Sequence, residues 1–131
     1  MRDDTSPAGQ PPQKNPYDMI GGEAGVRRLV DRFYDIMDSE PEATAIRAMH
    51  AADLSPMRQR LFEFMSGWLG GPRLYNRCVM SAHQPFAIGT AERDQWLKCM
   101  QRALTDIDAD PAVRKLLEQP LFSMADAVRN R

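Results

Sequence analysis

The chain has 131 residues and a formal net charge of −1, from 17 basic and 18 acidic side chains. This length favours one domain with a core large enough to fold alone, and the balanced charge argues against a nucleic acid or an anionic membrane as a partner. No apolar run is long enough to cross a bilayer, and the opening segment MRDDTSPAGQ does not resemble a signal peptide, so we expect a cytoplasmic protein.

Residues 1–16 contain proline, glutamine and charged side chains with almost no apolar ones. This composition predicts a disordered N-terminal tail, followed by one folded domain over residues 17–131. The folded part is expected to begin with a turn of helix in YDMIGG, which Gly21 and Gly22 end.

A helix is predicted over residues 23–37, because its apolar side chains recur at helical spacing. Pro41 then restarts the chain, and a short helix is expected through Ile46 and Met49, with His50 at the corner that follows. The predicted apolar stripe of the long helix is Val26, Leu29, Val30, Phe33, Tyr34 and Met37.

The next helix has clear start and stop signals. Ser55 is the candidate N-cap and Pro56 suits the first helical position, whereas Gly70, Gly71 and Pro72 end the helix. Its predicted apolar face is Met57, Leu61, Phe64, Met65 and Trp68.

The second half of the chain is expected to be irregular over residues 73–89, with a turn or two of helix before His83. A helix capped by Thr90 follows, and its predicted inward side chains are Trp96, Leu97, Met100, Leu104 and Ile107. The pair Asp110 and Pro111 starts a last helix, which Pro120 is expected to kink or divide. Its predicted apolar side chains are Val113, Leu116, Leu117, Leu121, Met124 and Val128. No strand pattern of useful length is present, so the predicted fold class is all-α.

Few residue patterns in the chain indicate catalysis. No glycine-rich phosphate loop follows a strand. Cys78 and Cys99 lack the spacing of a zinc site, and we favour two reduced thiols over a disulfide.

One of the two histidines, His83, lies beside Pro85 and Phe86. A lone histidine beside apolar residues is usually structural, but an imidazole can also supply an axial nitrogen to a haem iron. Nine methionines are many for this length; they fill an ordinary core or line a large apolar ligand. From these residues alone, both interpretations remain open.

Three stretches together resemble the truncated haemoglobins, the two-over-two globins, and within them group II. LVDRFYDIM resembles the family's second helix, and LFEFMSGWLGGPRLY resembles its distal helix with the glycines that end it. AHQPFAIGTAERDQWLKCM resembles the proximal histidine and the following helix with its tryptophan. The resemblance covers about residues 16–130, and it implies a two-over-two helical sandwich around haem b (iron protoporphyrin IX).

The same resemblance assigns roles to individual residues. His83 matches the proximal histidine, whose ring nitrogen binds the iron. Tyr34 and Trp96 match the distal tyrosine and the group II tryptophan, His50 lies at the distal corner facing the ligand, and Arg60 matches a position that can reach a haem propionate. The other residues of the predicted haem-binding site line the slot: Met57, Leu61, Phe64, Tyr75, Phe86, Ile88 and Met124. Structural roles remain the alternative for these positions, as core side chains, a helix-end histidine or a solvated arginine.

The sequence departs from the family pattern before the iron ligand. Only NRCVMSA separates GGPRLY from His83, which is shorter than in many group II members. Ala82 stands where many members have an arginine that helps to anchor a propionate. Arg77 is a candidate substitute for that anchor.

The resemblance implies binding of dioxygen, carbon monoxide, nitric oxide or peroxide. Bound dioxygen carries partial negative charge, and the Tyr34 hydroxyl, the Trp96 indole N–H and an N–H of neutral His50 are candidate donors to it. We therefore expect slow dioxygen release, and a role in sensing or in redox, nitric oxide or peroxide detoxification rather than transport. A reductase partner is expected for turnover, and the chain is expected to be a monomer or a homodimer.

Two other functional classes remain open. A haem peroxidase-like enzyme would share the cofactor and differ in its kinetics. A cofactor-free helical interaction module would purify without visible colour. The resting iron is also open, because His50 or Tyr34 could ligate it in the absence of gas.

Overall fold

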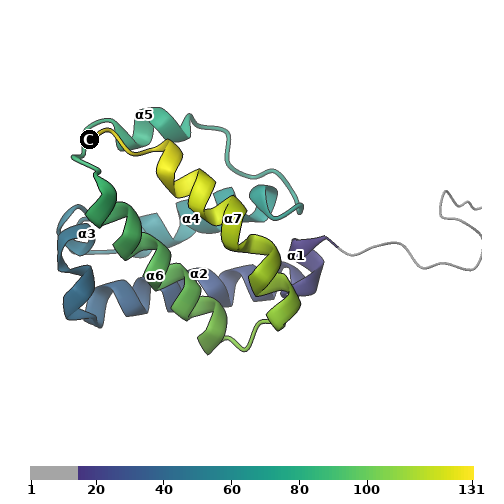
Figure 1. Cartoon of the computed structure of the whole chain (residues 1–131). Helices are drawn as coiled ribbons and strands as arrows, with labels where there is room; N and C mark the ends of the chain where they lie inside the picture. The colour runs from purple at the N-terminus through teal and green to yellow at the C-terminus, as the bar shows by residue number, and fades with distance from the viewer. Residues whose placement is uncertain (1–14) are drawn as a thin grey trace, which may run out of the picture.

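A computed structural model describes residues 15–131, and every regular element in that range is a helix. The order along the chain is α1 (Pro16–Met19), α2 (Gly22–Ser39), the 3₁₀ turn η1 (Pro41–Ala43), α3 (Thr44–Ala48), α4 (Ser55–Trp68), α5 (Val79–His83), α6 (Thr90–Asp106) and α7 (Pro111–Ala127) (Figure 1). The prediction of an all-α chain is confirmed.

The predicted tail, residues 1–16, falls almost wholly outside the described residues, which begin at Asn15. Its last two residues belong to the folded part. Asn15 caps α1 by accepting a hydrogen bond from the N–H of Asp18 at 2.9 Å, and Pro16 is the first residue of α1.

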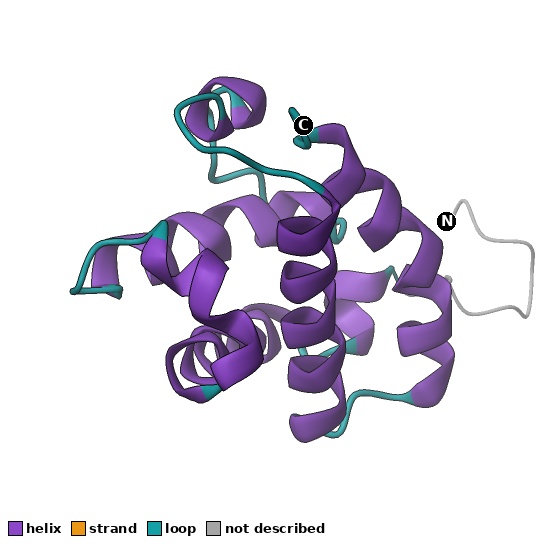
Figure 2. Ribbon diagram, turned by 60° about the vertical axis from the view of Figure 1, so that its left-hand side comes forward, coloured by secondary structure: helices purple, strands orange, loops and turns teal. Residues whose placement is uncertain are grey.

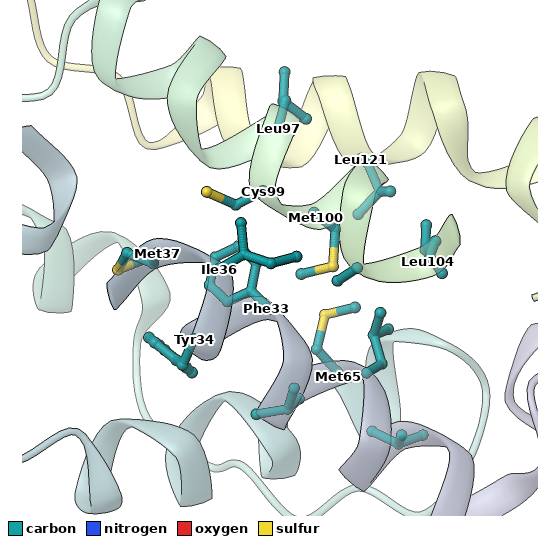
Figure 3. Close-up of a cluster of buried hydrophobic side chains, with 14 of the residues drawn as sticks. Phe33, Tyr34, Ile36, Met37, Met65, Leu97, Cys99, Met100, Leu104 and Leu121 are labelled. Atoms are coloured by element: carbon teal, nitrogen blue, oxygen red, sulfur yellow. The ribbon is translucent and has the colours of Figure 1, made fainter. Parts of the chain in front are cut away.

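Helix α2 is the centre of the packing, because α4 and α6 both pack against it, and α7 in turn packs against α6 (Figure 1). Figure 2 shows residues 15–131 as helices joined by loops, without a strand. Side chains from these four helices meet in one core, among them Phe33, Met65, Met100 and Leu121 (Figure 3). All six residues of the predicted α2 stripe are buried, as the helical period requires.

Two glycines let α1 close the end of the bundle. Gly70 has a φ of +104°, a conformation that favours glycine, and a Cβ on Gly71 would lie 2.3 Å from the Tyr17 ring. The N–H of Tyr17 donates to the Leu69 carbonyl at 2.9 Å. The glycines therefore end α4 and also allow α1 to contact it closely.

Some details of the helix ends differ from the predictions. Ser55 is the first residue of α4 rather than its N-cap, and the Asp53 carboxylate accepts from the Ser55 N–H at 3.0 Å. Helix α6 begins at Thr90, and the Glu92 carboxylate accepts from the N–H of Gly89 at 2.8 Å. Short side chains at a helix start often serve as caps, but here a nearby carboxylate accepts the free N–H instead.

Helix α7 bears on two expectations. It continues through Pro120 without division, so of the two predicted effects of this proline only a kink is left. Leu116, predicted to face inward, is 54% exposed, whereas its neighbour Leu117 is buried. Adjacent residues on a helix lie about 100° apart, so only one of the two leucines can face α6.

Candidate functional site

His83 is the last residue of the short helix α5, and it is half-buried. Its Nδ1 lies 2.7 Å from the carbonyl oxygen of Val79, one turn earlier. A carbonyl oxygen only accepts hydrogen bonds, so Nδ1 carries the hydrogen and Nε2 keeps its lone pair in the neutral ring. An imidazole fixed in this way is suited to bind a metal through Nε2.

His50 has the same arrangement in the turn after α3. Its Nδ1 lies 2.7 Å from the Ile46 carbonyl oxygen, again one turn earlier. Burial lowers the pKa of His50 below 6.5, the bond to Ile46 opposes this, and the charges of Arg47 and His83 lower the pKa further. The ring is therefore neutral at pH 7, and its single N–H, at Nδ1, donates to the Ile46 carbonyl oxygen.

The tautomer of His50 changes its expected role. The sequence suggested an N–H donor to the ligand, but the structure leaves a lone pair at Nε2. The charge of His83 contributes to the lowered pKa of His50, although the two residues are far apart in the chain.

Tyr34, on α2, is 3% exposed, and its ring packs edge-on against Phe33 and His50 with centroid separations of 5.0 and 5.8 Å. Burial raises its pKa well above 10, and the charge of Arg58 partly opposes this, so the hydroxyl stays protonated. Burial and the charge of Arg58 are the only influences on the pKa of the Tyr34 hydroxyl, and no hydrogen bond within residues 15–131 is among them. The hydroxyl oxygen is not one of the fully buried atoms that lack a partner, so this donor remains accessible to a ligand.

Trp96, on α6, is half-buried and packs against Phe33 with a centroid separation of 5.3 Å. Phe33 thus supports both predicted donors, Tyr34 from its own helix and Trp96 from the facing one. Figure 3 shows Phe33 and Tyr34 projecting from neighbouring positions of α2 beside α6. The Trp96 indole N–H is not among the fully buried atoms of residues 15–131 that lack a partner, so it remains accessible to a ligand.

Helix α4 has two apolar faces. Phe62, Met65 and Leu69 are buried against the core, whereas a second stripe remains half-exposed and consists of Met57, Leu61, Phe64 and Trp68. Sequence reasoning placed Met57, Leu61 and Phe64 in the ligand slot but did not identify Phe62. The Arg27 guanidinium covers the Phe62 ring at 3.7 Å.

The other predicted wall residues differ in burial. The rings of Phe64 and Tyr75 meet edge-on at 6.0 Å. Phe86 is 38% exposed, whereas Ile88 is 8% exposed. Exposed apolar groups close to His83 in the chain, including Phe86, are surfaces that a flat apolar macrocycle would bury.

The arginines expected near propionates lie at the surface. Arg60 is exposed and contacts the Met57 sulfur at 3.8 Å. Arg77 and Ala82 are exposed as well. Arg60 and Arg77 therefore remain candidates, with no anionic partner among residues 15–131.

Two residues near the site were not identified from the sequence. Arg58 donates to the Asp31 carbonyl at 2.9 Å and to the Asp35 carboxylate at 2.8 Å, and its guanidinium lies 5.9 Å from the Tyr34 ring centroid. Asn130 donates to the Phe86 carbonyl at 2.7 Å and accepts from the Ile88 N–H at 2.9 Å. Asn130 thereby fixes the loop that follows His83.

The donor set fits a cofactor held by one protein nitrogen. Residues 15–131 contain no group of three or more His, Cys, Asp or Glu side chains that could hold a bare metal ion. Cys78 is exposed, Cys99 is buried, and the two are not joined. One imidazole, two accessible donors and half-exposed apolar faces are what a haem requires from its protein.

The two main surface hollows of the described residues lie away from His83. A hollow of about 340 Å³ beside the end of α2 is lined in part by Asp38 and Arg47, and one of about 200 Å³ between α6 and α7 is lined in part by Arg114. Neither hollow includes His83. None of the helices in the described range combines the length and apolar character needed to cross a membrane.

Comparisons with known proteins identify the family of the chain. The family model of the Bacterial-like globins matches residues 15–130. The group 2 truncated hemoglobin YjbI of Bacillus subtilis is 31% identical over 107 residues, which are 78% of this chain and 78% of that protein. The group II 2-on-2 hemoglobin of the plant pathogen Agrobacterium tumefaciens is 36% identical, with a TM-score of 0.86 over 92% of this chain and 97% of that one. The cold-adapted truncated hemoglobin of the Antarctic marine bacterium Pseudoalteromonas haloplanktis is 39% identical, with a TM-score of 0.85 over 90% and 99% of the two chains.

Proposed function

Because the chain belongs to the bacterial-like globins, and within them is a haem-binding truncated haemoglobin of group II, we propose that His83 binds the iron of haem b and that Tyr34 and Trp96 slow the release of dioxygen. The observation that carries this proposal is the fixed ring of His83, which presents the lone pair of Nε2 beside apolar side chains that the chain leaves partly uncovered.

When bound at His83, haem would supply an iron that can bind a small diatomic ligand. The chain's own groups then act on that ligand. The Tyr34 side chain is buried and its hydroxyl is protonated, and the indole N–H of Trp96 can only donate. Both groups would stabilise dioxygen, which carries partial negative charge, more than carbon monoxide.

The expected size of this effect follows from the hydrogen bonds. A hydrogen bond contributes about 0.5–1.5 kcal/mol, and more when the acceptor is charged, so each donor is worth up to about tenfold in a dissociation rate. Slow release of dioxygen suits sensing, or redox, nitric oxide or peroxide detoxification, better than transport. Turnover would require electrons from a reductase, and the protein acts as a monomer or a homodimer.

Absorption spectroscopy tests the iron ligand. The full chain, expressed with ample porphyrin precursor, should show a Soret band and about one iron per chain. His83→Ala should lose haem far faster to an excess of a haem-scavenging globin than His50→Ala does. A colourless protein would instead favour a cofactor-free interaction module, and equal haem loss from both variants would contradict the assignment of His83.

Stopped-flow kinetics test the two donors. Tyr34→Phe and Trp96→Phe should each speed dioxygen dissociation by up to about tenfold, while carbon monoxide dissociation changes less. Leu97→Ile, on the same helix but buried in the core, is the matched control for a packing change. If neither donor variant changes dioxygen release by more than about twofold, the donor role is wrong.

A further inference from the structure

We propose that His50 is a proton acceptor for hydrogen peroxide in the ligand pocket. This proposal rests on the haem-binding function proposed above and deepens it, because it adds a substrate class that carries a proton. Dioxygen, carbon monoxide and nitric oxide have no proton to give, so a base in the pocket would serve none of them.

The tautomer of His50 is the first step of the argument. Nδ1 lies 2.7 Å from the carbonyl oxygen of Ile46, so this nitrogen carries the hydrogen and Nε2 carries the lone pair. A neutral imidazole in this state can accept a proton at Nε2 but cannot donate one from it. The bond to Ile46 also stabilises the imidazolium that forms, since Nδ1 remains a donor in both states.

The surroundings of His50 keep it unprotonated. Burial is the main cause of its lowered pKa, and the facing charged or titratable groups are Arg47 from α3 and His83 from α5, with the protonated hydroxyl of Tyr34 on α2. No carboxylate contributes to the pKa of His50. Arg47 is engaged by the Asp38 carboxylate at 2.7 Å and by the Ala51 and Ala52 carbonyls at 3.0 Å each.

The position of His50 relates it to the ligand site. Its ring packs edge-on against Tyr34, with a centroid separation of 5.8 Å. His50 therefore lies on the Tyr34 side of the pocket. The pocket then combines an acceptor, His50, with two donors, Tyr34 and Trp96, which matches a peroxide that both donates and accepts.

The proposed step is a proton transfer alone. One O–H bond of hydrogen peroxide breaks, its electron pair stays on the oxygen, and the proton forms a new N–H bond at Nε2 of His50. The products are a hydroperoxide anion and an imidazolium, so charge and atoms balance without an added oxidant or reductant. The anion is the form that a ferric iron attracts, and Tyr34 and Trp96 can donate to it.

Stopped-flow mixing of the ferric, haem-loaded full chain with hydrogen peroxide tests this step. A positioned general base contributes about 10²–10⁴ in rate, so His50→Gln should slow the reaction by about a hundredfold, because an amide has negligible basicity. Tyr34→Phe is the matched variant on the same side of the pocket, and it should slow the reaction less. Carbon monoxide association to the same ferrous variants reports steric change, and the loss for peroxide should exceed any change for carbon monoxide at least tenfold.

The pH profile gives a second measurement. The His50-dependent rate should be flat near pH 7 and fall as His50 becomes protonated, and this fall should lie below pH 6.5 because burial lowers the pKa. The profile of His50→Gln should lack this acid limb. An unchanged limb in the variant would show that another group titrates.

Nitrogen NMR of the full chain, in the diamagnetic carbon monoxide complex, tests the tautomer without turnover. At pH 7, Nδ1 of His50 should carry the hydrogen and Nε2 should not. A hydrogen on Nε2 instead would overturn the proposal, even if the His50→Gln variant fails to fold. Normal haem and carbon monoxide binding with an unchanged peroxide rate in His50→Gln would overturn this inference alone, whereas a protein that binds no haem would overturn the proposed function beneath it.

Discussion

The core around α2 and the segment of residues 73–89 are built in opposite ways. In the core, Phe33, Met65 and Met100 are 0% exposed. In residues 73–89, Ile88 is the only buried side chain, and Leu74 and Met80 are about half exposed, at 48% and 50%. The core can therefore stabilise itself, whereas the segment that holds His83 has apolar side chains whose burial requires something other than the chain.

The largest expected effect is a difference in the free energy of unfolding between alanine variants of two phenylalanines, one from each region. Phe33→Ala should lower the free energy of unfolding by about 3–5 kcal/mol, because it leaves a cavity in a packed core. Phe86→Ala should cost less than about 1 kcal/mol in haem-free protein, since Phe86 is 38% exposed and surface changes are usually small.

Urea denaturation of both variants, with and without haem, measures this difference. The cost of Phe86→Ala should rise when haem is bound, while that of Phe33→Ala should stay nearly constant. Equal costs for the two variants in haem-free protein would show that residues 73–89 are as well packed as the core.

A smaller effect is expected where Asn130 joins the two regions. Asn130→Ala removes the hydrogen bonds to the Phe86 carbonyl and the Ile88 N–H, at about 1–3 kcal/mol for the groups left unpaired. Hydrogen exchange should report faster exchange at Ile88 with little change in the core. Asn76→Ala, an exposed asparagine in the same region, is the control, and a similar acceleration there would argue against a clamp.

The smallest expected effect is the loss of stability at low pH through the Asp126 carboxylate. Asp126 on α7 accepts from Arg93 at 2.8 Å and from Arg129 at 3.0 Å, and both arginines hold the pKa of its carboxyl below 3.8. A lowered folded pKa gives stability that is present above the unfolded pKa and is lost as the pH falls through the folded pKa.

The melting temperature of Asp126→Asn should therefore be lower than that of the unmodified chain at about pH 6, and the difference should shrink toward about pH 3. The side chains of Asp126 and Arg129 are partly exposed to solvent, so the difference in melting temperature should also become smaller in high salt. A difference that does not vary with pH would mean that the carboxylate charge is not responsible.

The regular parts of the fold could be predicted because one pattern determines each of them. The α2 stripe follows a single helical period, and Asp110 with Pro111 marks the start of α7, where the Asp110 carboxylate accepts from the Ala112 N–H at 2.8 Å. Phe62 and Leu116 could not be assigned in this way. Each is next to another apolar residue, and only the packing of the neighbouring helix decides which of the two is buried.

The candidate site could be predicted less completely. The resemblance identified His83, Tyr34 and Trp96, but a sequence does not specify which imidazole nitrogen carries a hydrogen. That choice depends on the carbonyl one turn earlier, which only the geometry of a helix end brings within 2.7 Å of the ring. The Asn130 clamp was missed for a related reason, since no local pattern connects residues 42 positions apart.

That separation bears on how the protein is made. On a ribosome the chain emerges from its N-terminus, and domains acquire structure as their parts become available. Helix α2 and helix α4 can associate well before Asn130 leaves the ribosome, but Asn130 cannot hold the loop after His83 until then. A nascent chain whose C-terminus is still held in the ribosome should thus offer a looser entrance to its cofactor than the released polypeptide does.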